Sequence, residues 1–255
     1  MKIGTNTVLQ TSCGLELNRL LPSGDTISDK TADKNKPWVV QAGWQMGATG
    51  DTLVVDVEQM LSTGELGQAL LAHEFGHKMH QDESLIQETA LLAKFLGESA
   101  EGKLNGPQEQ IKTLQLKAIT RSLEILQLRE LEAWDIGKIL ADFLEVPEAS
   151  YERYATLALK RYFKHSYVMA AEMVRIAVGS ADLKQDRIAL YNPSSGDYEE
   201  LTLEELFLVE DKNYAEGELL KGFDEYSICV NDYPEFVKAF GQRQPKNEAL
   251  PEQLF

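Results

Sequence analysis

The chain has 255 residues, of which 43% are hydrophobic and 26% charged, and its formal net charge is −16. This composition excludes a wholly disordered chain or a fibre, and the length suits one sizeable domain or two small ones. The acidic balance disfavours nucleic acids and anionic membrane surfaces as partners, because both repel a protein of like charge.

Cysteine usage and hydropathy favour an intracellular protein. The two cysteines, Cys13 and Cys229, form no CxxC motif, which excludes a thiolate metal cluster, and sparse cysteine is typical of a reducing compartment. The first residues contain no apolar stretch of the kind found in secretory signals. The sequence contains no run of about 18 apolar residues, the length that a membrane-spanning helix needs. We therefore expect a soluble, cytoplasmic protein without membrane contacts.

The predicted elements begin after residues 1–50, whose mixture of Gly, Ser, Thr, Asn and Asp with short apolar pieces predicts irregular structure. Thr52–Val57 is a β-branched run that predicts a strand. This strand could form the edge of a sheet on which an extended peptide substrate pairs, or it could be an ordinary core strand.

Residues 62–178 show a helical pattern interrupted by loop signals. Ser62 and Glu65 have the spacing of a capping box and predict a helix that ends near Gln81. Three further helices are predicted over residues 83–96, with Gly97 as the stop signal, over residues 108–145, before Pro147, and over residues 148–178, before Gly179.

Residues 181–255 differ from the helical segment. Arg187–Tyr191 and Tyr198–Thr202 flank the turn sequence NPSSGD and predict a β-hairpin. We therefore predict an α+β, mainly α-helical fold with a small sheet. It consists of a domain over residues 1–180 and a small α+β C-terminal region over residues 181–255.

The segment HEFGH, residues 73–77, carries the clearest chemistry and lies within the first predicted helix. His73 and His77 are one turn apart on one helical face, with Cβ atoms about 5–6 Å apart, so their imidazole nitrogens can bind one metal ion. Glu74 lies about 100° around the helix from His73, where it can reach a water molecule on the metal. This HExxH arrangement predicts two zinc ligands and one general base. Histidines that serve only packing are the alternative.

A hydrolytic zinc site usually has three protein ligands and one open position. His80 continues the stripe of His73 and His77, but it lies about 10.5 Å along the axis from His73, so one ion would reach it only if the helix broke. A carboxylate from the helix over residues 108–145 fits better. Glu130 and Glu132 each interrupt an apolar stripe, where an unpaired buried carboxylate is costly. Periodicity does not choose between them, and both could instead lie on an exposed face.

The segments HEFGH and RELEAWD together resemble the zincin metallopeptidases of the gluzincin type, most closely the HtpX-type proteases and the ImmA/IrrE-type peptidases. Their second motif is a Glu followed three residues later by Ala, so the resemblance assigns the third ligand to Glu130, three residues before Ala133. The HtpX-type pattern has Asp directly after that Ala, whereas here Trp134 stands there and Asp135 follows. The resemblance covers about residues 62–145.

The resemblance implies a zincin-like helical core in which His73, His77 and Glu130 hold Zn²⁺ and Glu74 acts as the general base of peptide-bond hydrolysis. It also implies a protein or peptide substrate, and residues 181–255 could dock one partner, as in a regulatory peptidase. The alternative is a binding or structural protein with a structural zinc and no turnover, although such a metal needs no base. Three side chains could stabilise the oxyanion or serve only packing: Tyr162, His165 and Tyr167.

Overall fold

The structure is a computed structural model, and it describes residues 2–3, 9–10, 16–21, 26–29, 42–47, 50–55, 57–62, 64–79, 83–178, 181–193 and 195–215. Its elements are β1 (Lys2–Ile3), β2 (Leu9–Gln10), the 3-10 helix η1 (Leu17–Leu20), β3 (Thr26–Asp29), β4 (Ala42–Gly47), β5 (Gly50–Val55), α1 (Val57–Ser62), α2 (Glu65–Met79), α3 (Glu83–Ala100), α4 (Gln108–Phe143), α5 (Glu148–Ala177), β6 (Arg187–Asn192), β7 (Asp197–Thr202) and α6 (Leu203–Ala215). The fold is α+β and mainly helical, as predicted. Within these ranges, no helix combines the length and the apolar character that a membrane crossing needs.

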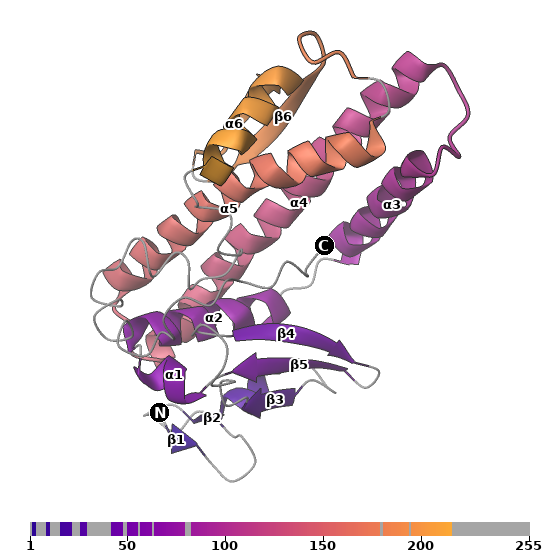
Figure 1. The fold of residues 1–255 in the computed structure, drawn as a ribbon. Coiled ribbons are helices and arrows are strands. Elements are labelled where there is room, and N and C mark those ends of the chain that lie inside the picture. Colours follow the sequence, from indigo (N-terminus) through magenta and orange to yellow (C-terminus); the bar gives the residue numbers. More distant parts are fainter. Residues whose placement is uncertain are drawn as a thin grey trace, which may run out of the picture.

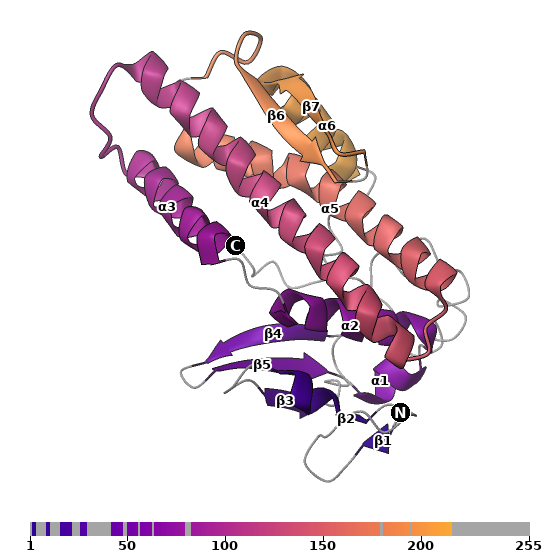
Figure 2. The same cartoon turned by 180° about the vertical axis from the view of Figure 1, so that it is seen from behind.

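The elements form layers around α2. A three-stranded sheet lies on one side of α2, and the antiparallel pair α4 and α5 lies on the other (Figure 1). The helix α3 runs beside the first half of α4, and the hairpin β6–β7 packs with α6 at the far end of the molecule (Figure 2). The second half of α4 therefore contacts α2, and α2 is the helix that carries His73 and His77.

The strand order in the sheet corrects one prediction. β5 is central, with β3 parallel on one side and β4 antiparallel on the other, so the edge-strand interpretation of Thr52–Val57 is wrong and the core-strand alternative holds. Leu53 and Val55 of this strand are fully buried. Residues 1–50 were predicted to be irregular, but they contain β1 to β4. Propensity did not reveal β4 because two of its six residues are glycines, which are depleted in strands.

The bounds of the helices confirm the break at Pro147 and correct one predicted start and one predicted stop. Ser62 ends α1, and α2 begins only at Glu65, so the predicted capping box is wrong. α3 continues through Gly97 to Ala100, because its C-terminal stop is Gly102, whose φ of 67° suits the left-handed position of a helix terminus. The ends of α4 and α5 and the hairpin lie within two residues of their predicted bounds. Gly179 lies outside the described residues.

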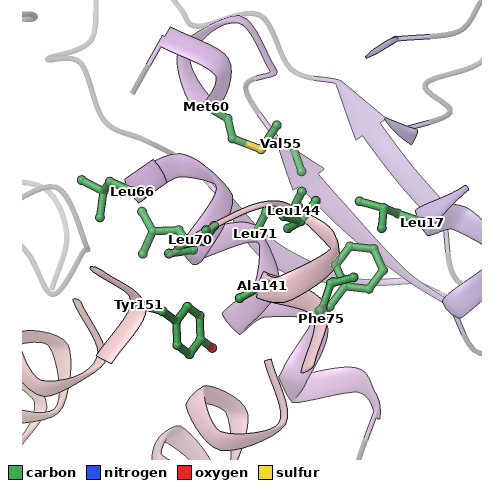
Figure 3. Packing of buried hydrophobic residues seen from close by; sticks show 14 of the residues in the cluster. Leu17, Val55, Met60, Leu66, Leu70, Leu71, Phe75, Ala141, Leu144 and Tyr151 are labelled. Carbon is green, nitrogen blue, oxygen red and sulfur yellow. The ribbon is translucent and has the colours of Figure 1, made fainter. Parts of the chain in front are cut away.

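Two hydrophobic clusters hold the layers together. The sheet-side core (Figure 3) consists mainly of Leu17, Leu53, Val55, Val57, Met60, Leu66, Leu70, Leu71, Phe75, Trp134, Leu140, Ala141, Leu144 and Tyr151. The hairpin-side core consists mainly of Leu96, Leu116, Ile119, Leu123, Phe163, Tyr167, Val174, Val178, Ile188, Leu190, Leu201, Leu203 and Leu206. Side chains from before and after residue 180 share the hairpin-side core. The domain division at residue 180 and a docking role for residues 181–255 stay predictions.

Candidate metal centre

The helices α2 and α4 approach each other closely at two glycines. A Cβ atom on Gly76 would lie 2.0 Å from the carbonyl oxygen of Ala133, and one on Gly137 would lie 2.6 Å from the carbonyl oxygen of Ala72. No larger residue fits at either position unless a backbone moves, because glycine alone lacks the Cβ. This reciprocal contact places the HEFGH segment against the RELEAWD segment.

The crossing brings one carboxylate to both histidines of the HExxH motif. Nε2 of His73 and Nε2 of His77 lie 3.3 and 3.5 Å from Oε2 of Glu130. One ligand atom from each of these residues lies within 4.8 Å of the others, and no other such group occurs in the described part of the chain. Glu132, the alternative that periodicity left open, does not belong to the group. His80 lies outside the described residues.

The three side chains fit a small divalent cation. In a tetrahedral zinc site with bonds of about 2.0–2.1 Å, ligand atoms are about 3.3 Å apart, close to the observed distances of 3.3 and 3.5 Å. Oε2 of Glu130 is buried and has no hydrogen-bond partner among the described residues. A buried oxygen without a partner destabilises the folded state, and a cation or a hydrogen-bond donor beside it would remove that cost.

The surroundings set the protonation of two of the three groups. Burial lowers the pKa of His73 below its ordinary value of 6.5, against the opposing influence of Glu130. Burial by itself would raise the pKa of Glu130, but its interactions with His73 and His77 outweigh this effect and lower the pKa to about 2. At neutral pH the site thus offers a neutral His73 imidazole and an ionised Glu130 carboxylate, which are the forms that bind zinc.

The site is closed at one end and open at the other. His73 is 1% exposed and the adjacent Glu74 is 8% exposed, so both lie inside the fold. The side chains of His77 and Glu130 keep 18% and 13% of their surface exposed. Solvent therefore reaches the site along the edge formed by His77 and Glu130, whereas His73 forms its back.

Two aromatic residues lie beside the site for which the sequence analysis predicted no role. Trp134 stacks on His73, with ring centroids 4.3 Å apart, and Tyr151 of α5 packs edge-on against Trp134 at 5.3 Å. Asp135 is exposed, so it does not replace the Asp that follows Ala in the HtpX-type pattern. The departure from that pattern is the one signal that could have identified Trp134. Tyr151 belongs to another helix and carries no signal in the sequence.

One of the three oxyanion candidates, Tyr167, lies away from the metal ligands. The ring of Tyr167 lies in the hairpin-side core, and its hydroxyl donates a hydrogen bond to Glu199 of β7. Tyr162 and His165 also belong to α5, and for these two residues the oxyanion role stays a prediction.

Comparisons of the chain with models of protein families, with curated proteins and with solved structures return no match. The functional assignment therefore depends on the geometry of this site and on the resemblance that HEFGH and RELEAWD carry.

Proposed function

We propose that this protein is a zinc-dependent metallopeptidase of the zincin type, which hydrolyses peptide bonds in protein or peptide substrates. The observation that carries the proposal is the convergence of His73, His77 and Glu130 from two helices onto one point. The three ligands found among the described residues leave one tetrahedral position for water or substrate, whereas structural zinc sites are usually closed by four. The ligand count therefore favours a catalytic metal over a structural one.

Each residue of the site has a distinct role in this proposal. His73, His77 and Glu130 hold the ion, which when bound acidifies water and polarises the scissile carbonyl. Glu74 accepts the proton of the attacking water on its carboxylate and delivers it to the leaving amine nitrogen as the C–N bond breaks. The buried position of Glu74 beside His73 suits this role, because burial keeps bulk water from competing for the proton.

The sheet offers a surface for an extended substrate. β4 pairs on one side with β5, and its other edge pairs with no described strand. β4 lies next to α2, the helix that carries His73 and His77 (Figure 1). A peptide can add to such an edge through main-chain hydrogen bonds, so β4 takes the role first considered for Thr52–Val57. The net charge of −16 favours neutral or basic substrates.

Metal analysis and three variants test the proposal. We expect about one Zn²⁺ per purified chain, and loss of the metal in His73→Ala and Glu130→Ala, because each removes a ligand. Glu74→Gln should retain zinc and lose cleavage of a mixture of unstructured peptides followed by mass spectrometry, because glutamine cannot accept the proton.

Glu132→Ala is the matched control for Glu130→Ala, since it removes a carboxylate from the same helix outside the ligand group. We expect this variant to keep its zinc. Full cleavage by Glu74→Gln would refute the catalytic assignment. A wild-type chain that holds one zinc ion yet cleaves none of the peptides would favour the alternative, a protein with a structural metal.

A further inference from the structure

Trp134 lies directly against one of the proposed metal ligands. Its indole ring stacks on the imidazole of His73, with ring centroids 4.3 Å apart and ring planes inclined by 24°. The two residues are 2% and 1% exposed, so the stack is part of the interior. His77 meets the same imidazole only edge-on, at 4.6 Å and 72°. Trp134 is therefore the flat surface on which the ring of His73 rests.

The second ring nitrogen of His73 lacks the anchor that a histidine ligand ordinarily has. Such a ligand donates the N–H of its other nitrogen to a carboxylate or a carbonyl, which fixes the orientation of the ring. Nδ1 of His73 is buried, and it has no hydrogen-bond partner among the residues that the structure describes. Packing must therefore fix the direction in which Nε2 points.

Trp134 is itself held in place by α5. The hydroxyl of Tyr151 donates a hydrogen bond of 2.7 Å to the main-chain carbonyl of Trp134, and the two rings meet at 5.3 Å and 60°. A Cβ atom on Gly137 would lie 2.6 Å from that hydroxyl, so the glycine leaves room for the bond. These contacts link α5 to the metal ligand through Trp134.

We propose that Trp134 is the positioning residue of the metal centre: its stacked indole fixes the imidazole of His73 with Nε2 directed at Glu130, in place of a hydrogen-bond anchor at Nδ1. This inference rests on the proposed metal site, and it does not depend on whether the protein cleaves peptides. It assigns to an aromatic face the task that a carboxylate or carbonyl performs in other zinc sites.

Zinc affinity, measured by competition with a chromogenic chelator, tests the inference in two variants. Trp134→Phe keeps an aromatic face, and we expect its affinity to stay within about threefold of the wild type. Trp134→Leu keeps only apolar bulk, and we expect its affinity to fall by about 10–100-fold, the usual effect of losing a group that orients a ligand. The visible absorption of bound Co²⁺ should keep its shape in Trp134→Phe and change in Trp134→Leu.

Leu123→Ala is the control for lost packing alone. Leu123 is buried on the same helix but belongs to the hairpin-side core, so its truncation should destabilise the fold and leave zinc affinity unchanged. Wild-type affinity in Trp134→Leu, or equal losses in Trp134→Leu and Trp134→Phe, would overturn the inference and leave the proposed function intact. A wild-type chain that binds no zinc would overturn both. Unimpaired cleavage by Glu74→Gln would remove only the catalytic role.

Discussion

Gln115 and Gln127 lie on the two halves of α4, and both side chains are buried. On the hairpin side, Nε2 of Gln115 donates to the carbonyl oxygen of Ala177 at 2.6 Å and to the hydroxyl of Ser99. In the second half of α4, Gln127 is 0% exposed, and neither its amide nitrogen nor its amide oxygen has a hydrogen-bond partner among the described residues. The same type of side chain is satisfied in the first half of the helix and left without partners just past its middle.

The difference holds for the two regions as a whole. In the part of the chain that the structure describes, buried side-chain polar atoms without a hydrogen bond belong to four residues. They are His73 and Glu130 of the proposed metal site, Trp134, which stacks on His73, and Gln127, three residues before Glu130 on α4. On the hairpin side, the buried hydroxyl of Ser166 donates to the carbonyl of Phe163 at 2.6 Å. Because folds tolerate such atoms mainly at functional sites, the contrast separates scaffold from site.

The largest expected effect tests the close contact on the sheet side. Gly76→Ala would place a Cβ atom 2.0 Å from a backbone oxygen of α4, so the helices must separate. We expect a loss of about 3 kcal/mol or more in the free energy of unfolding in urea, together with loss of zinc.

Gly97→Ala is the matched control, because nothing lies within 4 Å of a Cβ at this position in the last turn of α3. Alanine favours helices over glycine, so this variant should gain about 0.5–1 kcal/mol. Wild-type stability and zinc content in Gly76→Ala would show that the two helices do not depend on this contact.

A smaller effect on the free energy of unfolding is expected when each of the two glutamines is replaced by methionine. Gln115→Met removes two hydrogen bonds and leaves the hydroxyl of Ser99 as the side-chain donor to the Ala177 carbonyl. At about 0.5–1.5 kcal/mol for each lost bond, we expect a loss of about 1–3 kcal/mol. Gln127→Met removes an amide that has no partner, so its stability should stay unchanged or rise by about 1 kcal/mol. Urea unfolding of both variants measures the difference. Equal losses in the two variants would contradict the contrast between the two halves of α4.

The smallest effect concerns a half-exposed ion pair on the hairpin side. Nε and Nη2 of Arg121 donate to the Glu88 carboxylate at 2.7 and 2.9 Å, which lowers the pKa of Glu88 below its ordinary 4.5. A lowered carboxyl pKa adds stability above the unfolded-state pKa, and this stability is lost as the pH falls through the folded-state pKa. Glu88→Gln should therefore be slightly less stable than the wild type at pH 7, with a difference that shrinks below pH 4.5.

Thermal unfolding at neutral and acidic pH measures this shift. We expect the two melting curves to converge in acid, because the wild-type carboxyl is then protonated and, like the amide of glutamine, uncharged. A difference of the same size at both pH values would show that Glu88 contributes through packing and not through its charge. The effect should be small because water screens half-exposed ion pairs.

Local patterns in the sequence predicted those parts of the fold that local contacts determine. The spacing of His73 and His77 placed both on one helical face, and the proline at position 147 marked the start of α5. The approach of Gly76 to Ala133 was beyond such reasoning, because periodicity reports which face of a helix is apolar and not which distant helix it meets. The choice between Glu130 and Glu132 depended on that crossing. Before the structure, only the resemblance favoured Glu130.

The sheet shows the same limit. β5 was visible as a β-branched run, but its neighbours were not, since β4 carries two glycines and β3 pairs with it across more than twenty residues of chain. Parallel pairing is nonlocal, and short polar strands have no strong pattern of their own. The sequence therefore left open whether Thr52–Val57 is an edge or a core strand, and β4 was not visible as an edge strand.

The glycine pair at the helix crossing has a consequence for protein engineering. Each of the two helices supplies the glycine that the backbone of the other requires, so neither helix can be transplanted into a new scaffold by itself. A designer who grafts HEFGH alone would carry over two donor side chains and lose the geometry that recruits the third. The portable unit is the pair of crossing helices, and sequence searches for similar centres should require both glycines together.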